Sequence, residues 1–339
     1  MNEVHVRELV PMAREIKVVV PHRISGFFEI VDHEYPVNPT LDDLSTIGSR
    51  GGGPCLSLGG ITRILVDEKK DDEDYQIRIN GKDCTVNART TRSALRWLPG
   101  EIFENYSLKI LHNYCLPIGA GYGSSGCGAV GSVVAMNVLF NLGMSLNQCG
   151  KIAHCAEVEN KTGLGTVGGM INGGCTITME PGYPFQLNSL IIPSWYKIAC
   201  ASKGGILTSD ILSDEHIRNK IISAGKDAMK SIVKGFTIEN FMKTSISFVK
   251  CTGMLDMEKL DLGGVKNIME ILNKESPEGI LGASMNQLGK SVYCVYTDGQ
   301  ENENFIQETF KANGFTEIFF LEFNPSGPQV VDFISDFCD

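Results

Sequence analysis

The most chemically informative part of the sequence is a glycine-rich stretch that runs from Leu116 to Ala129. It reads Leu-Pro-Ile-Gly-Ala-Gly-Tyr-Gly-Ser-Ser-Gly-Cys-Gly-Ala, follows a predicted strand and precedes a predicted helix. Glycines let a backbone approach an anion closely, and the first N–H groups of a helix are unpaired and lie at its positive dipole end. Because the loop contains no lysine, it is typical of a site for a polyphosphate accompanied by a metal ion. A glycine-rich helix start that only packs closely is the alternative.

Two familiar phosphate-binding loops are excluded by spacing. Gly121, Gly123 and Gly126 match the pattern GxGxxG of dinucleotide sites, but no acidic residue follows before Glu157, where a ribose ligand is expected about 20 residues on. Gly289-Lys290-Ser291 could end a Walker A loop, yet the first glycine of that motif would fall on Ser284.

Hydrophobic periodicity predicts the elements that must position this loop. We expect strands at 16–20, 27–31, 55–66, 75–79, 107–112, 175–179, 190–201, 291–296 and 317–323. We expect helices at 90–98, 124–142, 146–160, through most of 209–251, at 257–272 and at 301–312. Pro181-Gly-Tyr-Pro184 is the clearest signal of a domain boundary in the middle of the chain. The alternation of strands and helices predicts an α+β protein.

Composition limits the possible partners. With 339 residues and 42% hydrophobic residues, the chain is long enough for about two folded domains. The 30 basic and 40 acidic residues give a formal charge of −10, which disfavours nucleic acid and anionic membranes as partners. The chain is therefore expected to hold any anionic ligand through local groups.

Neither the cysteines nor the uncharged central segment indicates a secreted or membrane protein. The eleven cysteines are scattered and never form CxxC, so we expect reduced, mostly buried thiols. Residues 113–150 carry no charge but are crowded with glycine and polar residues, so a buried helix is favoured over a membrane span. We expect a cytoplasmic protein.

Three segments together resemble the GHMP kinases. Pro117-Ile-Gly-Ala-Gly-Tyr-Gly-Ser-Ser-Gly-Cys-Gly is similar to their central ATP-binding motif P-x-G-x-G-L-G-S-S-A-A. Pro21-His-Arg-Ile-Ser-Gly-Phe-Phe28 and Gly282-Ala-Ser-Met-Asn-Gln-Leu-Gly289 occupy the places of the first and third motifs. Within the superfamily the likeness is greatest to archaeal pantoate kinases, and it spans about Val18 to Tyr296.

The resemblance implies an α+β fold, namely the GHMP kinase fold. Its N-terminal ATP-binding domain, similar to ribosomal protein S5 domain 2, would span 1–186. Its C-terminal ferredoxin-like domain would span 187–339, and the site would lie in the cleft between the two.

The resemblance also implies roles for individual residues, with ATP and Mg²⁺ as cofactors. Ser125 and Glu157 would hold the Mg²⁺, and Arg23, Ser125 and Glu157 would be catalytic. The ATP-binding residues would be Pro117, Gly119, Ala120, Gly121, Gly123, Ser124, Ser125 and Gly126. The substrate would be bound by His22, Arg23, Ser25, Arg50, Thr166 and Ser284.

Two positions depart from the family pattern. Thr166, in Thr162-Gly-Leu-Gly-Thr-Val167, stands where many members have an aspartate, and a threonine cannot be a general base near neutral pH. Either the proton leaves the alcohol late, for phosphate or solvent, or a histidine such as His22 or His154 assists. Arg23 stands where mevalonate kinases have lysine and the pantoate kinase pattern has histidine. Its guanidinium suits a second phosphate or a carboxylate.

These departures favour an acceptor more anionic than pantoate. The leading expectation is a kinase that phosphorylates the 5-hydroxyl of mevalonate 3-phosphate to give mevalonate 3,5-bisphosphate, in archaeal isoprenoid synthesis by a mevalonate pathway. One alternative is pantoate kinase, which would form 4-phosphopantoate for coenzyme A synthesis. An alternative of another class is a sensor that binds ATP and a small molecule without turnover. A homodimer is the assembly considered.

Overall fold

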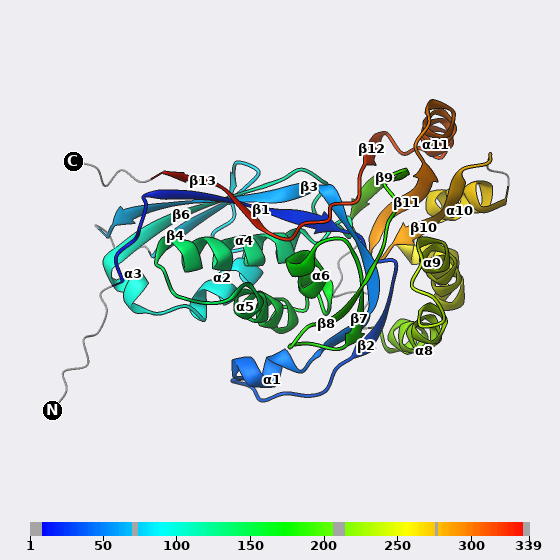
Figure 1. Ribbon diagram of the computed structural model, residues 1–339. Coiled ribbons are helices and arrows are strands. Elements are labelled where there is room, and N and C mark those ends of the chain that lie inside the picture. The colour runs from blue at the N-terminus through cyan, green and yellow to red at the C-terminus, as the bar shows by residue number, and fades with distance from the viewer. Residues whose placement is uncertain (1–8, 70–73, 206–213, 275–276, 335–339) are drawn as a thin grey trace.

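The computed structural model describes residues 9–69, 74–205, 214–274 and 277–334, which form two β-sheets with helices packed against them (Figure 1). The strands are β1 (Glu15–Arg23), β2 (Phe27–Val31), β3 (Gly48–Glu68), β4 (Tyr75–Ile79), β5 (Lys82–Asp83), β6 (Tyr106–Tyr114), β7 (Cys175–Glu180), β8 (Gln186–Leu190), β9 (Tyr196–Gly205), β10 (Ile280–Asn286), β11 (Gly289–Thr297), β12 (Glu317–Leu321) and β13 (Gln329–Ile334). The α-helices are α1 (Leu41–Ser45), α2 (Arg89–Arg96), α3 (Glu101–Asn105), α4 (Ser124–Leu139), α5 (Leu146–Glu159), α6 (Thr166–Asn172), α8 (Glu215–Ile232), α9 (Ile238–Thr252), α10 (Gly263–Lys274) and α11 (Gln300–Ala312).

The larger sheet is organised around the long strand β3. Its second half pairs with β1 and β6, and its first half pairs with β2 and β7, giving the main order β13-β1-β3-β6-β4-β5. Glycines allow the chain to pass closely here, because a Cβ on Gly53 would lie 1.8 Å from the carbonyl oxygen of Ile24. The strand β3 thus joins the two halves of this sheet, and β2 pairs with its glycine-rich first half.

Helices α2, α4, α5 and α6 cover one face of this sheet (Figure 1). Alternate residues of β1, namely Ile16, Val18 and Val20, are buried in the core between the sheet and these helices. Helix α4 is buried on almost every side, which accounts for the absence of charge around it. A helix surrounded in this way holds its N-terminus in a fixed place.

The smaller sheet is antiparallel with the order β10-β11-β9-β12. Helices α8 and α9 pack together, α8 also packs on β2, and α9 and α10 pack on β10. The largest hydrophobic cluster includes Phe27 and Phe28 of β2 together with Phe241 and Phe248 of α9. This shared core joins β2 of the larger sheet to the helices that flank the smaller one.

Several sequence expectations need correction or extension. The single strand expected at 190–201 is wrong, since β8 and β9 are separate and belong to different sheets. The strand expected at 55–66 is longer than predicted, because β3 begins at Gly48 and includes Gly48–Gly53. The segment Pro181–Pro184, expected to mark a domain boundary, connects β7 to β8, which pair in one sheet. Strands β10 and β13 were not predicted. Part of the helical expectation at 209–251 lies outside the described residues, and the domain limits at 186 and 187 stay predictions.

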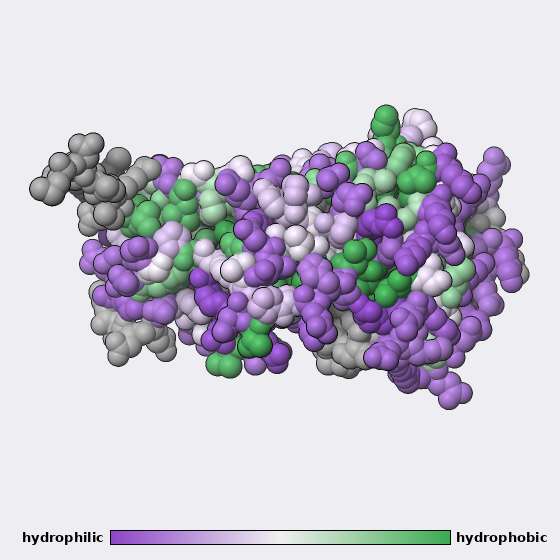
Figure 2. Space-filling model, turned by 90° about the horizontal axis from the view of Figure 1, so that it is seen from below, coloured by the Kyte–Doolittle hydropathy of each residue, from purple (hydrophilic) through white to green (hydrophobic). Residues whose placement is uncertain are grey.

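The face seen in Figure 2 is largely hydrophilic, with small apolar patches between polar groups. No helix among the described residues is long and apolar enough to span a bilayer. Ten of the eleven cysteines lie in the described part of the chain, and all ten are free thiols. The eleventh, Cys338, lies outside it.

Candidate active site

The glycine-rich loop joins β6 to α4 with three residues in the left-handed region. Gly119, Gly121 and Gly123 have φ values of 79°, 86° and 71°, which side-chain-bearing residues rarely adopt. Gly123 is the N-cap of α4, and no side chain from the described part of the chain caps that terminus. The first N–H groups of α4 are thus left for a ligand. The Oγ of Ser124, at this terminus, is buried and has no hydrogen-bond partner among the described residues.

The hairpin formed by β10 and β11 holds the loop from the other side. Ser291 Oγ donates a hydrogen bond of 2.6 Å to the carbonyl oxygen of Ala120, and Asn286 Nδ2 donates to the same oxygen at 3.3 Å. A Cβ on Gly289 would lie 2.2 Å from that oxygen. The segment expected to be a third motif therefore contacts the loop through its backbone and buried polar groups.

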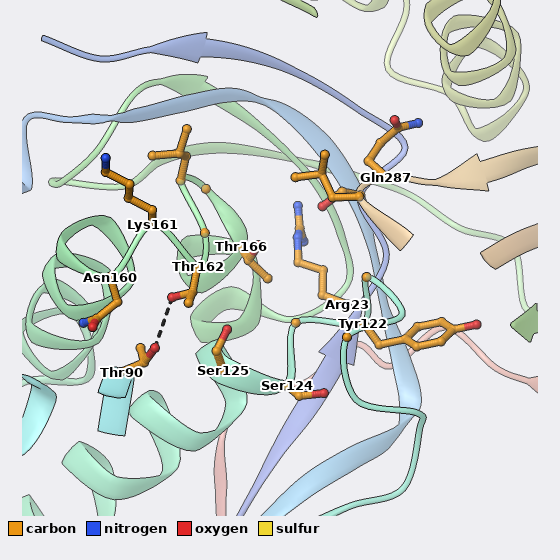
Figure 3. A pocket seen from close by; sticks show the side chains of 18 of the residues that line it. Arg23, Thr90, Tyr122, Ser124, Ser125, Asn160, Lys161, Thr162, Thr166 and Gln287 are labelled. Carbon is orange, nitrogen blue, oxygen red and sulfur yellow. Dashed lines mark hydrogen bonds between the residues drawn. The ribbon is translucent and has the colours of Figure 1, made fainter. Parts of the chain in front are cut away.

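A cavity of about 550 Å³ lies beside the loop. Of the predicted residues, its lining includes Arg23, Ser25, Gly119, Gly121, Gly123, Ser124, Ser125 and Thr166. Figure 3 shows Arg23, Ser125, Thr162 and Thr166 around it, while the Tyr122 side chain points away. Carboxylate and histidine side chains are missing from this lining, whereas the cations Arg23, Arg89 and Lys161 belong to it. A cavity whose charged lining residues are all cations suits an anionic ligand, even in an acidic protein.

Glu157 lies just behind the lining. It is 1% exposed, accepts a hydrogen bond of 2.7 Å from Thr162 Oγ1, and forms no ion pair with a described residue. Burial raises its pKa, and hydrogen bonds from the Ser125 and Thr162 hydroxyls oppose that effect. A buried carboxylate beside a hydroxyl, with no cation of its own, fits Mg²⁺, which prefers oxygen ligands. No group of three or more His, Cys, Asp or Glu forms a ready metal cage among the described residues, so phosphate oxygens and water would complete the shell.

Arg23 ends β1 and is only 3% exposed. Its Nη1 donates to Thr176 Oγ1 at 2.9 Å and its Nη2 donates to the Thr176 carbonyl oxygen at 3.1 Å. Within the described part of the chain it pairs with no carboxylate. A buried guanidinium without a counter-ion is a strong anion site.

Three predicted substrate residues lie outside the lining. His22 is buried, with Nδ1 3.1 Å from the Tyr122 carbonyl oxygen, and burial lowers its pKa to about 4. Arg50 lies opposite Glu29 in the neighbouring strand, and its Nε donates to Glu29 Oε2 at 2.9 Å. Ser284 is fully buried in β10. His22 and Arg50 are held by these contacts, whereas the buried Ser284 Oγ has no hydrogen-bond partner among the described residues. None of the three lines the cavity.

The remaining expected residues lie outside the cavity lining. Pro117, Ala120 and Gly126 do not line the cavity, although Ala120 anchors the loop. His154 is also held away, since its Nε2 lies 2.8 Å from the carbonyl oxygen of Ile47 and burial lowers its pKa to about 4.

Sequence reasoning missed a second group of lining residues. Asn87 precedes α2, and Arg89, Thr90 and Thr91 form the start of that helix. Lys161 and Thr162 follow α5. Thr90 and Thr162 are 3.1 Å apart through their hydroxyl oxygens, the contact dashed in Figure 3. Of these two stretches, only the one that continues into Thr162–Val167 was recognised from the sequence. The start of α2 carries no recognisable motif.

Comparisons with known proteins agree with this geometry. Residues 89–177 match the model of the GHMP kinases N terminal domain. A pantoate kinase of Methanospirillum hungatei JF-1 is 27% identical over 312 residues, which cover 92% of this chain and 94% of that protein. A pantoate kinase of Methanocaldococcus jannaschii is 28% identical over 282 residues, 81% of this chain and 90% of that protein.

A solved structure described as a phosphotransferase related to the CoA biosynthesis pathway has a TM-score of 0.77 at 24% identity. The match covers 94% of this chain and 98% of that one. The expected α+β GHMP kinase fold is therefore confirmed, with archaeal pantoate kinases as homologues. The chain is a phosphotransferase that acts on a hydroxyl group.

Proposed function

We propose that this chain is an ATP-dependent kinase that phosphorylates pantoate to 4-phosphopantoate, for coenzyme A synthesis. The observation that carries the proposal is a cavity lined by both the glycine loop and a buried arginine, Arg23, which pairs with no carboxylate among the described residues. The near full-length correspondence with pantoate kinases supports it. These relatives favour pantoate over mevalonate 3-phosphate, the acceptor expected from the departures in the sequence.

The charges around Arg23 support the same choice. Arg23 lines the cavity with Ser25 and Gln287, and it matches one carboxylate, the single charge of pantoate. Mevalonate 3-phosphate carries a phosphate as well as a carboxylate. Arg50 was expected to bind the acceptor beside Arg23, but its guanidinium is paired with Glu29 outside the cavity, which leaves Arg23 as the one buried cation among the described lining residues.

The loop from Gly119 to Ser125 would hold the ATP phosphates through backbone N–H groups and the first turn of α4. The start of α2 and Ile79 also line the cavity and would contact the nucleoside. Ser125 and Glu157 would hold a Mg²⁺ ion, which when bound would neutralise negative charge on the phosphates.

The proton of the acceptor hydroxyl has no strong base beside it. The lining provides Thr166 but no carboxylate and no histidine. Thr166 would orient the hydroxyl by a hydrogen bond, and the proton would leave late, to phosphate or to solvent. Catalysis would then depend on positioning and charge stabilisation by Arg23 and the loop.

A coupled assay that follows ADP formation tests the proposal with purified protein, ATP, Mg²⁺ and each of three acceptors: pantoate, mevalonate 3-phosphate and mevalonate. We expect turnover with pantoate. Turnover with mevalonate 3-phosphate alone would restore the earlier expectation. ATP binding without turnover of any acceptor would instead identify a sensor. The homodimer stays a prediction, and light scattering during gel filtration tests it.

A further inference from the structure

Helix α5 ends on an unusual residue. Lys161 has a φ of 55°, in the left-handed region, where glycine is favoured and a lysine is disfavoured. The Lys161 N–H donates to the Val158 carbonyl at 3.1 Å, and the Thr162 N–H donates to the Glu157 carbonyl at 3.0 Å. This pair of hydrogen bonds defines a Schellman motif with Lys161 at its left-handed position.

Two other helices end with the same motif and conventional residues. In α4 the left-handed position is Asn141, with φ 46°, and the Leu142 N–H donates to the Asn137 carbonyl at 3.0 Å. In α11 it is Gly314, with φ 77°, and the Phe315 N–H donates to the Phe310 carbonyl at 3.0 Å. Asparagine and glycine adopt this conformation at low cost. The lysine of α5 therefore carries a backbone cost that its neighbours avoid.

The side chain of Lys161 borders the cavity of the proposed kinase site. Figure 3 shows it beside Asn160 and Thr162, across Thr166 from Arg23. It is the one lysine in that lining, and the glycine loop itself has none. The residue is exposed to solvent, and its ammonium group forms no hydrogen bond or ion pair with a described residue.

A second, smaller cavity of about 220 Å³ shares Lys161 and Leu164 with the first, so these residues form part of the wall between them. The one acidic residue of the second lining, Asp32, is paired with Arg218. Neither cavity therefore offers Lys161 a free carboxylate.

We propose that Lys161 binds the phosphoryl group that is transferred, supplying the positive charge that the glycine loop lacks. The inference rests on the proposed ATP-dependent kinase function. Lysine is a compact point charge that suits a phosphate oxygen. Lys161 also directly precedes Thr162, whose hydroxyl donates a hydrogen bond to the Glu157 carboxylate. A binding role for the Lys161 side chain would explain why a lysine occupies this unfavourable left-handed position.

The test compares ATP with ADP, because only ATP carries the terminal phosphate. Binding of each nucleotide with Mg²⁺ is measured by calorimetry for Lys161→Gly, Lys161→Asn and Lys161→Arg. We expect the glycine and asparagine variants to lose about tenfold to a hundredfold in ATP affinity, with ADP affinity unchanged and Lys161→Arg close to the unsubstituted protein. Lys161→Gly should unfold at the same or a higher temperature, because glycine accepts the left-handed backbone.

Asn141→Gly is the matched control, since it changes the same motif at the exposed end of α4 and should leave both affinities unchanged. Equal loss of ATP and ADP binding, or unchanged binding of both, would overturn the role of Lys161. So would a Lys161→Arg variant that behaves like Lys161→Gly. Since no acceptor is present, these outcomes are independent of whether pantoate is the substrate.

Discussion

The guanidinium of Arg23 fits against the backbone of Gly169 so closely that a Cβ on Gly169 would lie 1.9 Å from Arg23 Nη1. Gly169 belongs to α6, which begins at Thr166. The helix that brings Thr166 to the cavity therefore also leaves the space for Arg23. One small residue couples the positions of two proposed substrate contacts.

Gly169→Ala should displace Arg23 and weaken acceptor binding while ATP binding is retained, because the glycine loop is not touched. The KM for pantoate is expected to rise about tenfold or more, the size of a lost charged hydrogen bond. Steady-state kinetics and ATP calorimetry measure the two effects. Gly100→Ala is the control, since a Cβ there meets nothing within 4 Å. Equal loss of both affinities would contradict this coupling.

Arg23→Met and Arg50→Met should fail in different ways. The first is expected to raise the KM for pantoate about tenfold to a hundredfold with ATP affinity unchanged. The second should leave kinetics unchanged but lower the free energy of unfolding by about 1 to 3 kcal/mol, because Glu29, 4% exposed, loses its partner. Kinetics and urea unfolding of both variants check this. A kinetic defect in Arg50→Met as large as that of Arg23→Met would return Arg50 to the site.

Glu157→Gln should weaken the response to magnesium about tenfold to a hundredfold, as loss of a ligand contact does. Without magnesium the variant should be at least as stable as the unsubstituted protein, because burial already raises the pKa of Glu157. Activity against Mg²⁺ concentration and thermal unfolding give the two readouts. Glu159→Gln is the matched control, since Glu159 accepts from Arg96 at 2.6 Å on the surface. An unaltered magnesium response in Glu157→Gln would remove this glutamate from the metal site.

Acid should destabilise the protein well before its carboxylates titrate. Burial lowers the pKa of His22, His112 and His154 from 6.5 to about 4. Between these values the unfolded chain binds protons that the folded chain does not, so stability falls as pH drops from about 6.5 to about 4. Each histidine contributes ~3 kcal/mol to that fall. Urea unfolding at pH 7.5 and 5.5 measures it, and His154→Gln should reduce the dependence. The exposed His33 is the control position, and an identical slope in His154→Gln would disprove the assignment.

The parts of the structure predicted correctly are those whose signal is local. The spacing from Gly119 to Gly126 requires a tight loop before a helix, and the uncharged segment around α4 requires burial; both are present. Glu157 could be placed beside Ser125 only through the family likeness, because the contact joins α5 to the start of α4. The likeness therefore supplied a contact that periodicity alone does not contain.

The parts predicted incorrectly depend on pairing between distant segments. Arg50 was expected to bind the substrate, but the glycines around it allow close strand packing in β3, and register places Arg50 opposite Glu29. Ser284 was expected at the substrate because its motif reaches the site, yet its own position in β10 is fully buried. Lys161 lines the cavity and has a backbone conformation that a lysine rarely adopts. No sequence pattern predicts that conformation.

The pairing of β13 with β1 has a consequence for how the protein is made. Val19 lies opposite Gln329 in that pair, and β1 continues to Arg23 at the cavity. While the ribosome is still synthesising the second sheet, β1 can pair with β3 but its outer edge remains open. The larger sheet therefore cannot be completed cotranslationally from its own early segments, and a nascent chain stalled before residue 329 would expose a strand edge prone to association with other chains.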